Sequence, residues 1–401
     1  MRIVKLLGDL IMNTKITAAV ASAALVLGAT TANAGIIIPA GEWTIDINGN
    51  VNTYVTMHSA DDSNTITGGT TPTEDATGEG DSQSINTGLL PAWLGFTGTT
   101  RQNDLDVSFT ISMQPNVSEN NVMGDSGDIV AWRQAFLTFG DASWGTVKMG
   151  KDIGIFSKNA ILSDMTLLGV GAIQSPRSGG NFTGGGIGTG YIYPAWKGQV
   201  SYTSPNMNGF QFTVGVTNPN QSADATHQAT NQDRLGLEAA LDFSFENGKI
   251  WTSGASYEVD CGTGCSYDAT AIDLGINFNL GNLGLTAYAY TADGAGTTFF
   301  HANAHNSGSE RESDGGYVQA TYVIPSGTKL GVSYGVSNLD KAGGEADSAL
   351  VDENNRLTVG AYHPLTKHLN LVAEFNKMES ESHNGLKNEA DSVSLGAILF
   401  F

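Results

Sequence analysis

Two pairs of residues could bind a metal ion. Cys261 and Cys265, in the motif CGTGC, are the only cysteines of the 401-residue chain. They supply half of a zinc site, and no second cysteine pair completes it. In an oxidising compartment we expect them to form a disulfide across an external loop, residues 260–270. His301 and His305 have the i,i+4 spacing of zinc ligands on a helix, but they lie in a polar, loop-like stretch. We therefore predict no metal site.

Catalytic motifs give no support for an enzyme. HExxH, a phosphate-binding loop and a dinucleotide fingerprint are absent from the sequence, and GVSYG at 331–335, which matches GxSxG, lies in a stretch that alternates like a strand. The seven histidines fall in predicted loops or turns, and none stands beside a recognisable nucleophile motif. We expect neither an enzyme nor a bound cofactor.

Charge is distributed unevenly along the chain. The formal charge is −21, whereas nucleic-acid binding requires a basic face, so we expect no nucleic-acid partner. Between residues 129 and 200 the balance is reversed. There, six basic residues outnumber three acidic ones: Arg133, Lys148, Lys151, Lys158, Arg177 and Lys197 against Asp141, Asp152 and Asp164.

This basic region has a characteristic order of elements. Two strands with a tight turn come first, from residue 129 to 152, and a second such pair runs from 196 to 216. Residues 153–195 between them are rich in glycine and show no sustained apolar periodicity. A connection of this length in an all-β chain is usually functional or disordered.

Three segments resemble the general porins of Gram-negative bacteria. They are RQAFL at 133–137, WGTVKMGK at 144–151, and SYTSPN…GF within 201–210. In that family the loop after the fifth strand folds into the barrel, and wall arginines or lysines face loop carboxylates. The resemblance implies that Arg133 and Lys151 occupy the family's wall positions. With the other charges of this region, we expect a pore constriction that contains Arg133, Lys148, Lys151, Asp164 and Arg177. Lys151 stands where the family usually has arginine, and Asp164 is the only acidic residue within the long loop.

The N-terminal residues predict export. Lys15, an apolar run over residues 16–29 and the small residues of Ala32-Asn33-Ala34 have the pattern of a signal peptide, which we place at 1–34. Because Met12 gives a signal of ordinary length, we interpret residues 1–11 as a start-site artefact. The remainder, residues 35–401, is expected to form a single domain.

Alternating apolar and polar residues recur throughout that domain. Residues 43–57, 105–113, 235–245 and 272–280 each place apolar side chains on one face. Seven short turns alternate with eight long loops, which predicts sixteen antiparallel strands and a water-filled lumen. The last strand ends on Phe401, which resembles the sorting signal of outer-membrane barrels.

The sequence thus predicts an all-β transmembrane barrel of sixteen strands with an infolded constriction loop. We expect an outer-membrane porin for passive diffusion of ions and small hydrophilic solutes, with weak selectivity that leans towards cations. A sugar- or phosphate-specific channel and a non-transport barrel (an adhesin or a lipid-active enzyme) are the alternatives. Five aromatic residues in and next to the long loop either form a sugar track or anchor it: Phe156, Phe182, Tyr191, Tyr193 and Trp196.

The partners of the protein can be predicted from the expected membrane barrel. The barrel is expected to contact outer-membrane lipid and lipopolysaccharide. The acidic external loops are expected to repel other chains and to concentrate cations at the mouth, with divalent bridging to lipopolysaccharide as the alternative. The resemblance implies a homotrimer in which the loop 114–128 reaches a neighbouring subunit.

Overall fold

The computed structural model describes residues 35–115, 117, 131–172, 183–218, 234–262, 265–298 and 301–401. The predicted signal peptide 1–34, Arg177, Phe182 and most of the loop 114–128 lie outside these residues. The described chain is almost entirely β-structure, with one short α-helix, α2 (Lys158–Ser163), and one 3₁₀ helix, η1 (Met165–Leu168).

The strands have the following bounds: β1 Ile36–Ala40, β2 Trp43–Ala60, β3 Asp81–Asn86, β4 Trp93–Gln102, β5 Leu105–Gln114, β6 Ala131–Asp141, β7 Gly145–Ile153, β8 Trp196–Thr203, β9 Phe210–Thr217, β10 Gly236–Phe245, β11 Gly248–Gly262, β12 Cys265–Leu280, β13 Leu283–Asp293, β14 His305–Asn306, β15 Ser309–Glu310, β16 Glu312–Val323, β17 Lys329–Leu339, β18 Val351–Pro364, β19 Leu369–Ser382 and β20 Lys387–Phe400.

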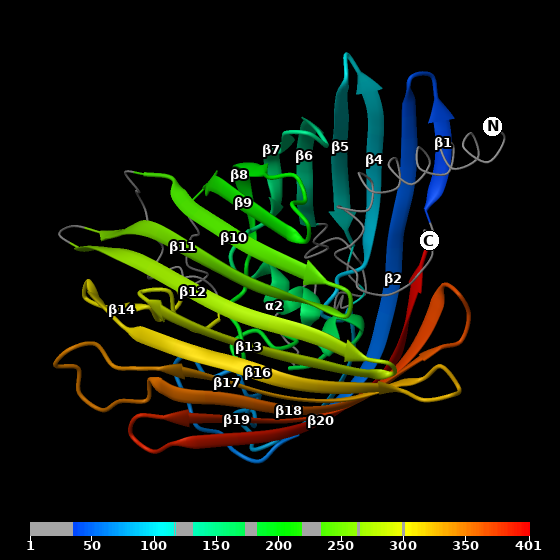
Figure 1. The fold of residues 1–401 in the computed structure, drawn as a ribbon. Coiled ribbons are helices and arrows are strands. Elements are labelled where there is room, and N and C mark those ends of the chain that lie inside the picture. Colours follow the sequence, from blue (N-terminus) through cyan, green and yellow to red (C-terminus); the bar gives the residue numbers. More distant parts are fainter. Residues whose placement is uncertain are drawn as a thin grey trace, which may run out of the picture.

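One antiparallel sheet closes on itself to make the barrel (Figure 1). It contains eighteen strands of the described chain. Because β3 and β4 pair with successive parts of β2, they count as one barrel strand, and β1 only extends β2 as a hairpin. Sixteen barrel strands remain, as the sequence predicted. Closure is made by β2 and β20, and the N–H and C=O groups of Gly49 and Phe401 continue this pairing at 2.9 and 3.0 Å.

Side-chain polarity is inverted relative to a water-soluble protein. Along β12, Ile272 and Leu274 are 57% and 60% exposed on the outer face, whereas Asp273 between them is buried inside. β2 alternates in the same way, with Val51 and Val55 outside and small polar residues inside. An apolar exterior around a polar lumen is what a transmembrane barrel requires. Within the described residues, the helices are too short and too polar to cross a bilayer.

Two features differ from the strand pattern expected from sequence. The strand β1, with its IIIPA sequence, was not predicted, and it pairs with the first residues of β2. The second barrel strand is interrupted between β3 and β4. In the tight turn after β4, Asn103 and Asp104 have left-handed φ values of 48° and 63°. Such values suit the two-residue turns of hairpins.

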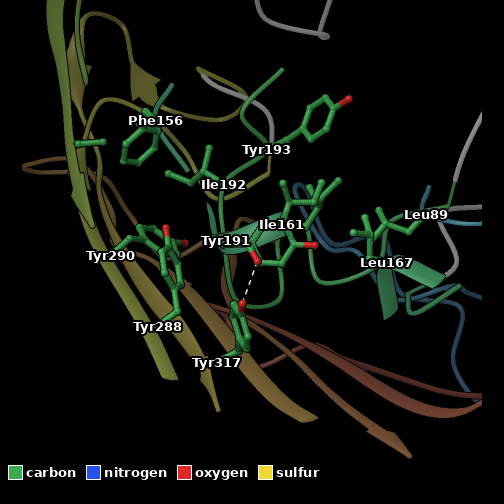
Figure 2. Packing of buried hydrophobic residues seen from close by; sticks show 14 of the residues in the cluster. Leu89, Phe156, Ile161, Leu167, Tyr191, Ile192, Tyr193, Tyr288, Tyr290 and Tyr317 are labelled. Carbon is green, nitrogen blue, oxygen red and sulfur yellow. Dashed lines mark hydrogen bonds between the residues drawn. The ribbon is translucent and has the colours of Figure 1, made fainter. Parts of the chain in front are cut away.

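The barrel interior is filled on one side by the chain that follows β7. In Figure 1, α2 lies inside the ring of strands. Figure 2 shows Phe156, Ile161 and Leu167 of this segment together with Tyr288 and the other labelled tyrosines of the interior. The buried aromatic cluster therefore joins the inner wall to the infolded segment.

Barrel closure can be tested at Gly49. A Cβ atom on this residue would lie 2.2 Å from the carbonyl oxygen of Trp93 and 2.9 Å from the Phe401 ring. We expect Gly49→Val to lower the free energy of unfolding by about 1–3 kcal/mol, the usual cost of overpacking. Urea unfolding of the purified barrel measures this. Gly343→Val, where a Cβ atom meets nothing within 4 Å, is the control; equal midpoints for the two variants would contradict the close packing at Gly49.

Candidate functional site

The infolded segment is bound to the inner wall at several points. It leaves β7 at Ile153, forms α2 and η1 in the lumen, and returns to the wall at Trp196. Because a loop inside a barrel leaves the pattern of strand pairing, its backbone N–H and C=O groups need other partners. Wall side chains supply these partners.

Glu238 of β10 holds the beginning of the segment. Its Oε2 atom accepts hydrogen bonds from the backbone N–H groups of Ile155 and Phe156, the latter at 3.0 Å. Its Oε1 atom pairs with Lys197 Nζ at 2.6 Å, and Lys197 also donates to the Tyr257 hydroxyl at 3.0 Å. The Lys197 and Glu238 side chains are 4% and 0% exposed. A buried ion pair with these extra hydrogen bonds is fully satisfied, so it fixes this end of the segment.

Glu374 of β19 holds the infolded segment at a second point, after η1. Its Oε2 atom accepts from the N–H groups of Val170 and Gly171 at 2.9 and 2.8 Å, and its Oε1 atom accepts from the Tyr362 hydroxyl at 2.7 Å. A Cβ atom on Gly169 would lie only 2.0 Å from this carboxylate. The glycine at 169 therefore permits the close approach of the loop backbone to Glu374.

The two helices are held by neutral side chains of β16. The Tyr317 hydroxyl donates to the carbonyl of Ala160 at 2.8 Å. The Gln319 amide donates to the carbonyl of Ser163 at 3.2 Å and accepts from the N–H of Met165 at 2.7 Å. These bonds satisfy backbone groups at the end of α2 and the start of η1, where a helix leaves them unpaired.

Asp164 lies between α2 and η1 and is buried, with a side chain 1% exposed. It accepts from the Thr166 N–H and from the Tyr191 hydroxyl, both at 2.9 Å. Its cationic neighbour is Arg356 of β18, at 3.8 Å and also 1% exposed. In this position the carboxylate stabilises the fold of the segment and is shielded from the lumen water.

The predicted basic residues are found in different environments. Lys148 faces the lumen and pairs with Asp152, which also accepts from Gln134 at 3.1 Å. Arg133 is 8% exposed, and its guanidinium lies 5.9 Å from the centre of the Trp196 ring. Arg177 lies outside the described residues.

Lys151 requires a correction. Side chains alternate along β7, so Lys151 shares the outer face with Met149, opposite Lys148 and Asp152. Its Nζ atom donates to the carbonyl of Trp132, whose side chain is 56% exposed. The structure therefore does not place Lys151 in the lumen, because the strand register turns it towards the outside.

Charges of both signs act on the N-terminus of α2. Lys158 at this end experiences the charges of Lys148, Asp152, Asp242 and Lys249. Lys249 pairs with Asp242 at 2.7 Å, and the neighbouring Asn159 bonds to both. We call Lys148, Asp152, Lys158, Asp242 and Lys249 the lumen ring. Of these five residues, only Lys148 belongs to the predicted constriction. The sequence analysis did not place Asp152, Lys158, Asp242 or Lys249 there.

The aromatic residues of the segment are anchors. Phe156 and Tyr191 are completely buried, and Tyr193 is 8% exposed. Tyr191 packs edge-on against Tyr317 at 5.9 Å between ring centres, and Figure 2 shows the two residues close together. The sequence left open whether these rings form a sugar track or anchor the loop. Phe156, Tyr191 and Tyr193 anchor it.

The wall residues Glu238, Glu374 and Arg356 were not selected from sequence as site residues. Each occupies an inward position next to at least one apolar outward residue, as in Leu237-Glu238-Ala239 and Arg356-Leu357. A charged residue on the lumen face of a predicted strand was therefore the available signal. Cys261 and Cys265 are joined by a disulfide at the β11–β12 hairpin, with their Cα atoms 5.1 Å apart.

The anchoring role of Glu238 can be measured by hydrogen exchange. Glu238→Gln removes the charge and one of the acceptors for the Ile155 and Phe156 N–H groups. Hydrogen bonds to charged groups contribute about 1.5–3 kcal/mol, so we expect exchange at these amides to accelerate by about tenfold or more. Glu258→Gln, at a half-exposed position of β11, is the control. Unchanged exchange in Glu238→Gln would show that the carboxylate does not hold the segment.

Comparison with known proteins supports the same architecture. The chain matches the Gram-negative porin family over residues 21–383. No curated protein matches the chain closely enough to count as a relative.

Solved structures share the fold at low sequence identity. The anion-selective porin from Comamonas acidovorans is 15% identical with a TM-score of 0.65, covering 90% of this chain and 100% of that one. The outer membrane channel DcaP of Acinetobacter baumannii is 14% identical with a TM-score of 0.66, and the match covers 90% of this chain and 99% of that one. Salmonella typhi OmpF, in complex with daunomycin, is 16% identical with a TM-score of 0.61, and the match covers 91% of this chain and 100% of that one. With its closed barrel, infolded segment and family match, this chain belongs to the Gram-negative porins and is an outer-membrane channel for passive diffusion.

Proposed function

We propose that the infolded segment sets the bore of this channel and that the lumen ring tunes its ion selectivity. The observation that carries the proposal is the position of α2. This helix is fixed in the lumen by wall side chains, and it presents Lys158 to charges of β7, β10 and β11. Charges that line a narrow aqueous passage act on every ion that crosses it.

The channel passes small hydrophilic solutes without a dedicated binding site. Phe156, Tyr191 and Tyr193 are packed into the anchor of the segment, so these rings offer no stacking track for a sugar. This supports general diffusion over the sugar-specific alternative. The barrel performs no catalysis in this proposal.

Selectivity is weak because charges of opposite sign act in series. The lumen ring holds three lysines and two aspartates, whereas the whole chain carries a formal charge of −21. The acidic external loops attract cations to the mouth, and the lumen ring opposes them. A weak preference for cations remains our prediction for the whole channel.

The proposed assembly is a homotrimer with its apolar outer face against lipid. Outward rows such as Ile272, Leu274 and Ile276 suit contact with lipid chains. The acidic external loops suit divalent bridges to lipopolysaccharide. Among the structural relatives, OmpT of Vibrio cholerae is described in a trimer form at 15% identity.

Planar bilayer recording tests the proposed channel and its assembly. We expect large ohmic current steps that occur in groups of three when one trimer inserts. Chemical cross-linking of the purified protein should give a three-subunit species. Single, ungrouped steps would contradict the trimer, and a folded protein without conductance would contradict the open channel.

Selectivity can be assigned to the lumen ring with Lys158→Gln. One unit charge about 7 Å from an ion in water contributes about 0.6 kcal/mol, with opposite signs for cations and anions, so we expect about a sevenfold rise in the cation-to-anion permeability ratio. The reversal potential in a low-salt gradient measures this ratio, since high salt screens the charge. Lys151→Gln is the matched control, because Lys151 lies on the outer face of β7. An equal shift in both variants, or none in Lys158→Gln, would contradict the assignment.

A further inference from the structure

The fold brings together two motifs that are far apart in the sequence. Cys261 and Cys265 flank the hairpin between β11 and β12, and His305 begins the small hairpin of β14 and β15. The two Sγ atoms and a ring nitrogen of His305 all lie within 4.8 Å of one another. Each motif alone is half of a metal site, and here the halves meet at the long-loop end of the barrel.

The separation of these three atoms suits a small thiophilic ion. Zn²⁺ binds thiolate sulfur at about 2.3 Å and imidazole nitrogen at about 2.0–2.1 Å, so its ligand atoms lie about 3.3–3.8 Å apart in a tetrahedron. Thiolate and imidazole are also the ligands that select zinc over calcium or magnesium. The cluster therefore has the donors of a zinc site with three protein ligands, and opening of the disulfide lets its two sulfur atoms separate to the spacing that zinc requires.

The hairpin that carries His305 is tied to its surroundings by Arg311. Arg311 donates to the carbonyl of Asn303 at 2.8 Å and makes two bonds to Glu345, at 2.6 and 2.9 Å. The same contact with Arg311 lowers the pKa of Glu345, which keeps this carboxylate charged. A Cβ atom on Gly308 would lie 3.6 Å from Cys265 Sγ, so the turn of the hairpin touches the disulfide.

The ring of Tyr267 lies against the histidine. The Tyr267 ring lies 5.0 Å from His305 and 6.3 Å from His301, measured between ring centres. His305 is 9% exposed, and its Nδ1 atom accepts a hydrogen bond from the Gly308 N–H at 3.2 Å. A metal either takes the place of this N–H at Nδ1 or binds at Nε2 after a change of tautomer.

We propose that Cys261, Cys265 and His305 form a redox-controlled binding site for a thiophilic metal ion such as Zn²⁺. The oxidised protein holds the disulfide and binds no metal there. A dithiol reductant transfers two electrons and two protons to the disulfide and is itself oxidised to a cyclic disulfide. The metal then displaces the two thiol protons and binds both thiolates and the His305 imidazole, with water as the remaining ligand.

Metal binding to the folded barrel tests this site directly. The purified porin is reduced, freed of reductant under argon and titrated with Co²⁺ and Zn²⁺. We expect one metal per chain, with thiolate-to-cobalt charge-transfer absorption, in the reduced protein and none in the oxidised one. His305→Ala should weaken binding by more than about tenfold, since even an outer-shell partner contributes about that much.

Control variants separate the site from unspecific binding and from misfolding. Cys261→Ser/Cys265→Ser should bind no cobalt in either redox state. His363→Ala, near the turn that joins β18 to β19, should bind as the unmodified protein does. Heat-modifiable migration on gels confirms that each variant is a folded barrel. Reduced protein without metal, oxidised protein with equal metal, or full binding by folded His305→Ala would each overturn the proposal.

Discussion

The need to pair every backbone polar group inside the membrane governs this structure. Lipid offers no hydrogen-bond partners, so a sheet that crosses it must leave no open edge. The pairing of β2 with β20, continued by Gly49 and Phe401, meets this need and joins the two ends of the domain. Close packing follows, because a side chain at Gly49 would collide with the Trp93 carbonyl. The position of this glycine is thus a consequence of closure.

The same requirement explains the charged residues of the lumen. An infolded segment cannot pair with the strands along its length, so its N–H groups point at side chains of the wall. Carboxylates are strong acceptors for such groups. Glu238 and Glu374 each accept two consecutive N–H groups, and each has a second partner on its other oxygen. The segment is therefore fixed by hydrogen bonds from wall side chains to its backbone as well as by its own buried side chains.

The architecture could be predicted from sequence because it depends on the two-residue alternation of side chains along each strand. Alternation along each strand identifies the strands and their outward faces, and the lengths of the connections give their number. The details of the lumen depend on contacts between distant residues. Asp164 was expected to face the pore, but Arg356, 192 positions away, and Tyr191 bury it. Lys151 matched a family motif, yet one step of register along β7 places it outside. The alternation of side chains along the strand would have indicated the outward position of Lys151, whereas the resemblance to the family motif did not.

The mouth and the constriction of the channel form one packed unit. The loop between β13 and β14 leads to His305, and its Thr298 carbonyl accepts a hydrogen bond from Tyr193 of the infolded segment at 2.8 Å. The first long loop contacts β18 and β19 through Thr70, Asn354 and Ser380. A change in the cysteine–histidine cluster therefore acts on a loop that also touches the constriction. Since packed contacts transmit displacement over short distances, the geometry of the bore depends on the long loops as well as on the barrel wall.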